Sequence, residues 1–160
     1  MKNLLKVSAV MAIMVGVILI VGGIWGIYFT YINIVQEKIV TPDDAFIPSQ
    51  SVRGPLTLKA QADIIRHHAL QSTDGKTFAE MPRQIPVLDQ SGNPVLGIDG
   101  QPVMEANTAR DIWITVTTLT TALNLGILTY VFSALIILFG LVSIWTGIIF
   151  CVLSRKRIIV

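Results

Sequence analysis

Residues 112–154 read IWITVTTLTTALNLGILTYVFSALIILFGLVSIWTGIIFCVLS, and this stretch, without a single charged side chain, decides the fold. As one helix it would be roughly twice as long as the ~30 Å hydrocarbon core of a bilayer. Two spans would need a turn near residues 128–133, where there is no proline, glycine pair or charge to form one. We therefore predict one transmembrane helix over residues 128–153, preceded by a Thr-rich outer or interfacial helix over residues 112–127.

A second uncharged stretch covers residues 7–36. Its strongly apolar part, residues 7–32, would form a helix of roughly 39 Å, enough to span a membrane. Lys2 and Lys6 ahead of it also fit a cleaved signal peptide, but such peptides have an apolar region of only about 7 to 15 residues and a small-x-small cleavage site. We therefore expect residues 7–32 to be retained as a signal anchor and first transmembrane helix.

Basic residues flank both apolar stretches at the ends of the chain. Residues 1–6 carry two lysines, and the tail, residues 154–160, carries Arg155-Lys156-Arg157. Because Lys and Arg are enriched on the cytoplasmic side, we expect a multi-pass protein of the plasma (inner) membrane with both termini in the cytoplasm. Residues 33–111, which contain all ten acidic residues, would then be extracytoplasmic.

Composition agrees with membrane residence. Hydrophobic residues make up 52% of the chain and charged residues 14%, whereas charged residues form about a quarter of ordinary soluble domains. Cys151 is the single cysteine, which excludes an intramolecular disulfide. The lipid bilayer is the expected partner, and nucleic acid is not, because the only basic triplet directly follows an apolar helix.

Small residues in the apolar stretches predict how the helices pack. Close approach of helices in lipid depends on small side chains, and Gly22 and Gly26 form one G-x-x-x-G pair while Ser143 and Gly147 repeat the spacing. These residues predict an antiparallel contact, either within one chain or between chains. Neither span contains an ionisable residue, the usual marker of a transport pathway.

The segment between the spans contains one clear amphipathic pattern. Residues 57–71 place apolar side chains at helical spacing and polar ones on the other side. Residues 72–76 provide a stop and turn, and Thr77 followed by Glu80 has the pattern of a capping box, which predicts a short helical turn over residues 77–81.

Residues 82–105 are rich in turn signals. The sequence Pro86-Val87-Leu88-Asp89 has a weak echo in Asn93-Pro94-Val95-Leu96, and each unit alternates an apolar patch with a turn. We expect a small β-hairpin or a pair of extended arms. Asp89 and Asp99 lack the spacing of a calcium loop.

The sequence contains no catalytic motif. His67 and His68 are adjacent and would point about 100° apart on a helix, which is unsuitable for holding one metal ion. A two-His, one-carboxylate iron centre with Asp63 or Glu80 would require both rings to turn to the same side. We expect no metal, no cofactor and no enzymatic activity.

The motifs Ala60-Gln61-Ala62-Asp63-Ile64-Ile65, His68-Ala69-Leu70 and Thr73-x-Gly75-Lys76-Thr77-Phe78-Ala79-Glu80-Met81 resemble an actinobacterial family of small two-span membrane proteins. The resemblance extends to the basic start with its long first helix and to the Thr-rich run 113–126. It implies the two-span topology. Members often carry the label "aromatic ring-opening dioxygenase", although the iron ligands of such enzymes belong to a different, larger subunit. Many relatives have a shorter segment where this chain has residues 87–103, so a surface formed there would belong to a subgroup.

The predicted fold class is thus an all-α membrane protein: two antiparallel transmembrane helices, a small, mostly helical extracytoplasmic segment and a possible short β-hairpin. The expected function is protein–protein interaction through the extracytoplasmic segment, with a membrane-protein partner or a second copy. Alternatives are an accessory subunit or assembly factor of a larger membrane complex and, third, a ring-opening dioxygenase. The candidate interaction surface comprises Asp63, Arg66, His67, His68, Thr73, Gly75, Lys76 and Glu80.

Overall fold

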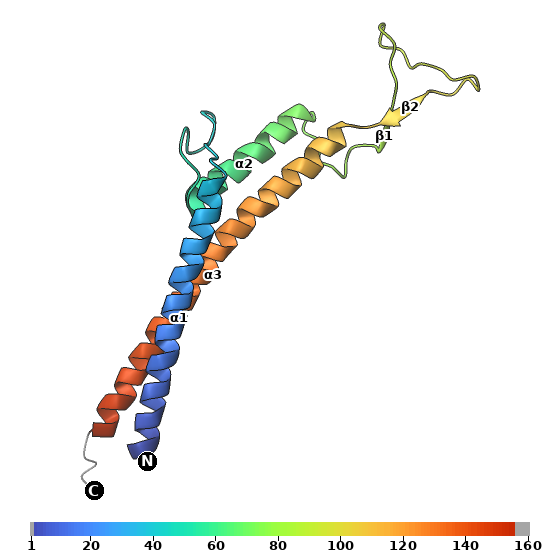
Figure 1. The fold of residues 1–160 in the computed structure, drawn as a ribbon. Coiled ribbons are helices and arrows are strands. Elements are labelled where there is room, and N and C mark those ends of the chain that lie inside the picture. Colours follow the sequence, from blue (N-terminus) through green and yellow to red (C-terminus); the bar gives the residue numbers. More distant parts are fainter. Residues whose placement is uncertain (1, 156–160) are drawn as a thin grey trace.

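The computed structural model describes residues 2–155 and contains two long antiparallel helices that lie side by side (Figure 1). The elements are α1 (Lys2–Gln36), α2 (Pro55–Ser72), β1 (Gln84–Pro86), β2 (Met104–Ala106) and α3 (Ala109–Arg155). Helix α2 packs along the N-terminal half of α3, and β1 pairs with β2 in an antiparallel hairpin beyond it. The predicted combination of two antiparallel apolar helices, a shorter middle helix and a β-hairpin is confirmed. We call residues 37–108, which connect the long helices, the head.

Helix α3 is a single uninterrupted helix of 47 residues. The Thr-rich stretch is therefore continuous with the following apolar part. Its hydroxyl groups donate hydrogen bonds to carbonyl oxygens one turn earlier, as from Thr118 to Ile114 and from Thr129 to Leu125, both at 2.8 Å. Because these groups are satisfied within the helix, polar residues do not break it. Both α1 and α3 are long and apolar enough to cross a membrane.

The contact between α1 and α3 is made by small residues at intervals of seven. The buried positions are Ala9, Gly16, Gly23 and Thr30 on α1, and Ser133, Gly140, Gly147 and Ser154 on α3. A Cβ atom on Gly16 would lie 2.6 Å from the carbonyl oxygen of Gly140, and one on Gly140 would lie 2.8 Å from the carbonyl oxygen of Gly16. Only glycine fits such a backbone contact, and the seven-residue period is that of a left-handed coiled coil.

Three of the four residues that we predicted to pack between the two helices lie in or beside this contact. The Ser143 hydroxyl donates to the carbonyl oxygen of Ala12 at 2.8 Å. A Cβ atom on Gly147 would lie 2.9 Å from the carbonyl oxygen of Ala9, and one on Gly26 would lie 2.6 Å from Ser133 Oγ.

Gly22 does not lie in this contact, because a Cβ atom there would meet nothing within 4 Å. Successive residues point about 100° apart on a helix. Since Gly23 faces α3, Gly22 points elsewhere. The four-residue spacing of Gly22 and Gly26 therefore did not identify the contact stripe.

Helix α2 is held on α3 by an apolar face. Gly54 and Pro55 begin the helix, and the Thr57 hydroxyl accepts a hydrogen bond from the Gly54 N–H at 3.2 Å, as a reverse cap. Leu58 is only 1% exposed and packs with Ala62 and with Leu123 of α3. Ile34 of α1 packs against the same cluster, beyond the stripe of small residues.

Candidate functional site

The turn after α2 is fixed to α3 through a buried tryptophan. The Trp113 indole N–H donates to the carbonyl oxygen of Lys76 at 2.9 Å and to Thr73 Oγ1 at 3.2 Å. Trp113 is 3% exposed and Thr73 is 5% exposed. Gly75 adopts φ +77°, and its N–H donates to the carbonyl oxygen of Leu70 at 2.7 Å. We conclude that Thr73, Gly75 and Lys76 close the end of α2, with Trp113 as an internal donor.

Glu80 stabilises the next turn. Its carboxylate accepts hydrogen bonds from the N–H and the hydroxyl of Thr77, both at 2.7 Å, and the Thr77 N–H is the main reason that the pKa of Glu80 is lowered. The predicted helical turn over residues 77–81 is a hydrogen-bonded turn without helix. The side-chain to backbone bond between Glu80 and Thr77 is nevertheless the one that the capping pattern predicts.

The remaining candidate residues lie along α2 and have separate partners. Asp63 forms an ion pair with Lys59 one turn earlier. The guanidinium of Arg66 lies over the Trp113 ring, 5.4 Å from its centroid, and so adds a cation–π contact to the α2–α3 interface. His67 Nε2 lies 3.0 Å from the side-chain nitrogen of Gln71.

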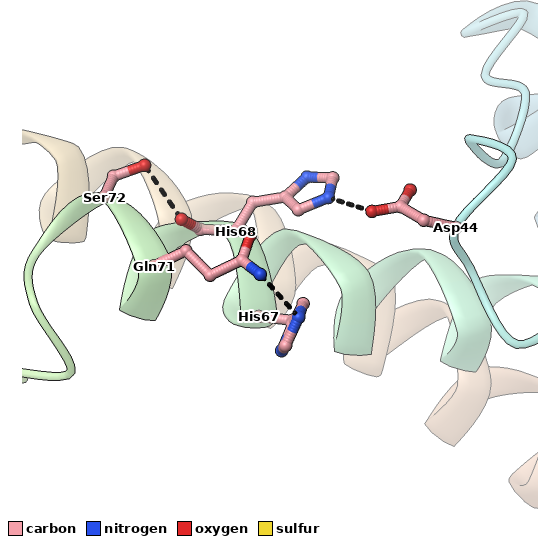
Figure 2. Close-up of polar contacts among 5 residues, drawn as sticks. All are labelled: Asp44, His67, His68, Gln71 and Ser72. Carbon is pink, nitrogen blue, oxygen red and sulfur yellow. Dashed lines mark hydrogen bonds and ion pairs between the residues drawn. The ribbon is translucent and has the colours of Figure 1, made fainter.

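Figure 2 shows that the two histidines point in different directions. His68 Nε2 lies 2.6 Å from Asp44 Oδ2 and joins α2 to the first loop of the head, whereas His67 contacts only α2. The hydrogen bond from His68 is the main cause that lowers the pKa of Asp44. Among residues 2–155, no three His, Cys, Asp or Glu side chains are grouped so that they could hold a metal ion. The residues of the predicted surface thus form two groups. One group fixes the turn after α2, and the other consists of exposed polar residues along α2.

The most distinctive part of the head is the arm, residues 84–106, which projects beyond the helices (Figure 1). The dipeptide Pro-Val recurs in it every eight residues, at residues 86–87, 94–95 and 102–103. The three valines close a ring of backbone hydrogen bonds: Val87 N–H donates to Val103, Val103 to Val95, and Val95 to Val87, at 2.8 to 2.9 Å. The arm is therefore a three-way junction of antiparallel chain segments.

The two loops of the arm repeat the same geometry. The Asp89 N–H donates to the Asn93 carbonyl at 2.8 Å, and eight residues later the Gly97 N–H donates to the Gln101 carbonyl at 2.8 Å. Gly92 and Gly100 occupy equivalent corners with φ of +80° and +71°, a conformation that glycine adopts without steric cost. The third segment of the junction is the stem formed by β1 and β2.

The repeat creates one continuous apolar face. Directly paired residues of antiparallel segments have side chains on the same side, and the three equivalent pairs are Pro86–Met104, Leu88–Pro94 and Leu96–Pro102. All six residues are exposed. We call these six residues the proline–leucine face. Ile98, at the tip of the second loop, is also fully exposed.

The charged residues of the arm itself have one sign, although Arg83 and Arg110 flank this part of the chain. Residues 84–109 contain Asp89, Asp99 and Glu105 and no lysine or arginine. Asp89 Oδ1 accepts hydrogen bonds from the N–H groups of Ser91 and Asn93 at 2.8 and 2.9 Å, and these bonds fix the first loop. The two loops of the arm therefore carry carboxylates and no cation, whereas Glu105, which pairs with Ile85, lies on the side of the stem opposite to Met104.

The repeat of Pro-Val-Leu was visible in the sequence, but we did not predict from it that the arm has an exposed apolar face. The signal that could have found it is the third Pro-Val at residues 102–103, which makes the period regular. No protein-family model, curated protein or solved structure matches the chain.

Proposed function

We propose that this protein is a non-enzymatic membrane protein that presents its arm to a protein partner outside the cytoplasm. The observation that carries the proposal is the exposed proline–leucine face, which belongs to the arm at the end of the molecule remote from the start of α1 and the end of α3 (Figure 1). Leu96 is 62% exposed, and no described part of the chain covers it. Clustered apolar side chains on a projecting surface are typical of protein-binding sites.

The carboxylates of the two loops define the chemistry of the partner. A complementary surface would bring aliphatic or aromatic side chains onto the proline–leucine face and Lys or Arg side chains against Asp89 and Asp99 of the loops. Complementary charge increases the rate and the specificity of association. An anionic lipid surface fits less well, because it would repel these carboxylates.

The orientation is part of the proposal. The N-terminus and the end of α3 lie at the same end of the helix pair (Figure 1), and this end carries Lys2, Lys6 and Arg155. The positive-inside tendency then places it in the cytoplasm of a plasma membrane and the head outside. A reporter fused after Val160 should be active only in the cytoplasm, and activity outside would contradict this orientation.

Site-specific photo-cross-linking in intact cells tests the interaction. A photoreactive residue at position 96 should give a discrete adduct with another protein, whereas one at position 71, on exposed α2, should not. The adduct at 96 should be lost in a Leu88→Ser, Met104→Ser variant that retains the helices. Equal capture at 71 and 96, or no capture at 96, would refute the proposal.

A second candidate is an accessory subunit or assembly factor of a larger membrane complex. It is favoured by exposed apolar side chains at the start of α3, where Ile112 and Leu119 share one side of the helix and are 40% and 48% exposed. Purification in mild detergent should then yield stoichiometric companions. The enzyme alternative would require iron to co-purify and to be lost when His67 and His68 are replaced.

A further inference from the structure

An apolar cavity lies where α1 and α3 separate. Its volume is about 450 Å³, within the range of about 300 to 1,000 Å³ that is usual for small-molecule sites. Its apolar wall includes Phe29 and Ile34 of α1, Leu119 and Leu125 of α3, and Leu58 of α2. Thr30, the last residue of the stripe on α1, and Leu58 of α2 both lie in its wall.

The position of this cavity connects it with lipid. Phe29 and Leu125 line it, and they are 54% and 56% exposed on the two helices that are long enough to span a membrane. Leu58 and Ile65 of α2 close it on the side of the head. The apolar surface of the spans thus continues into the cavity without a polar barrier, while the charged head begins at Glu37.

Four polar residues line the cavity, and Thr30 and Thr129 donate their hydroxyl hydrogens to carbonyl oxygens of their own helices. Asn33 uses its side-chain nitrogen to donate to the Phe29 carbonyl at 2.7 Å, and its side-chain oxygen accepts no hydrogen bond from residues 2–155. Glu37 also lines the cavity and forms no ion pair within residues 2–155. No lysine or arginine lines it, and Lys38 belongs to a different, smaller hollow.

We propose that this cavity binds one acyl chain of a membrane phospholipid whose headgroup carries a primary ammonium group, as in phosphatidylethanolamine. The chain replaces water on the apolar wall, which is favourable in proportion to the apolar area covered. The ammonium group donates hydrogen bonds to the Glu37 carboxylate and the Asn33 amide oxygen, the charge-assisted bond to Glu37 being the stronger. A phosphatidylglycerol headgroup has no cation for Glu37, and a phosphatidylcholine headgroup has no N–H donor.

Retention of lipid by the full chain tests this proposal. The protein is reconstituted in vesicles with equal amounts of phosphatidylethanolamine, phosphatidylglycerol and phosphatidylcholine, extracted in mild detergent, and examined by native mass spectrometry. We expect one retained phosphatidylethanolamine per chain. Ala122→Phe, which fills the cavity, should reduce retention at least tenfold, whereas Ala134→Phe, at an exposed position of α3 outside the cavity, should not.

The Glu37→Gln variant distinguishes recognition of the headgroup from binding of the acyl chain. This variant should retain lipid but lose the preference for phosphatidylethanolamine over phosphatidylcholine. Circular dichroism of all variants in lipid-free detergent, with unchanged helix content, shows that the fold is intact. The proposal is overturned if the wild type retains no lipid, if Ala122→Phe and Ala134→Phe retain it equally, if phosphatidylglycerol is preferred, or if a second copy of the chain occupies the cavity.

Discussion

Replacing Gly16 with alanine should destabilise the helix pair, and Gly22→Ala on the same helix provides the matched control. A Cβ atom on Gly16 would lie 2.6 Å from the Gly140 carbonyl oxygen, whereas ordinary contacts begin at 3.4 Å, so the helices must separate by up to about 0.8 Å. Overpacking of this kind costs about 1 to 3 kcal/mol. Replacing glycine with alanine stabilises the helix by up to about 1 kcal/mol through helix propensity at either position. This contribution therefore cancels when the stabilities of the two variants are compared.

The free energy of unfolding is measured by SDS titration in micelles, followed by far-UV circular dichroism. Gly16→Ala should be less stable than Gly22→Ala by about 1 to 3 kcal/mol. A Gly16→Ala, Gly140→Ala double variant should lose less than the sum of the single losses, because both are relieved by the same separation. Equal stability of Gly16→Ala and Gly22→Ala would show that α1 and α3 do not meet through this stripe.

Three further perturbations probe individual contacts. Ser143→Ala removes the hydroxyl bond to α1 and should cost about 0.6 kcal/mol, and at most about 1.7, in the same SDS titration. Trp113→Phe leaves the Lys76 carbonyl without its indole donor and should cost about 1 to 3 kcal/mol, seen as faster amide exchange in residues 73–78. His68→Ala should raise the pKa of Asp44 toward its ordinary value in a carboxyl NMR titration. In the native chain the contribution of Asp44 to stability is present above that ordinary value and is lost as the pH falls through the lowered pKa.

The fold could be predicted from the sequence where a single physical requirement dominates. Charge-free stretches of this length satisfy their backbone hydrogen bonds as helices, and α1 and α3 follow from that requirement alone. The amphipathic spacing of Leu58, Ala62 and Ala69 identified the face of α2 that packs on α3, because one helix needs only one apolar stripe to be held.

Features that depend on pairing between distant residues were not predictable in the same way. The division of residues 112–127 from 128–153 is a prediction about the position of the membrane, and both parts are helical as expected, with hydroxyl bonds inside α3. Trp113, whose type also suits a membrane interface, is instead buried because Thr73 and Lys76, some 40 positions away, accept its N–H. The proline–leucine face likewise depends on pairing between residues up to 18 positions apart, so the sequence did not indicate it.

The valine ring of the arm restricts how this part of the chain can change in length. Each corner of the junction needs one residue whose N–H and carbonyl both bond to other corners, and eight residues separate one corner from the next. A deletion of one or two residues in the segments next to a corner would move a different residue into the corner position. That residue could be a proline, which has no N–H, or a residue whose side chain points to the opposite side. Evolutionary insertions and losses should therefore be concentrated in the loop tips or should remove whole octapeptides.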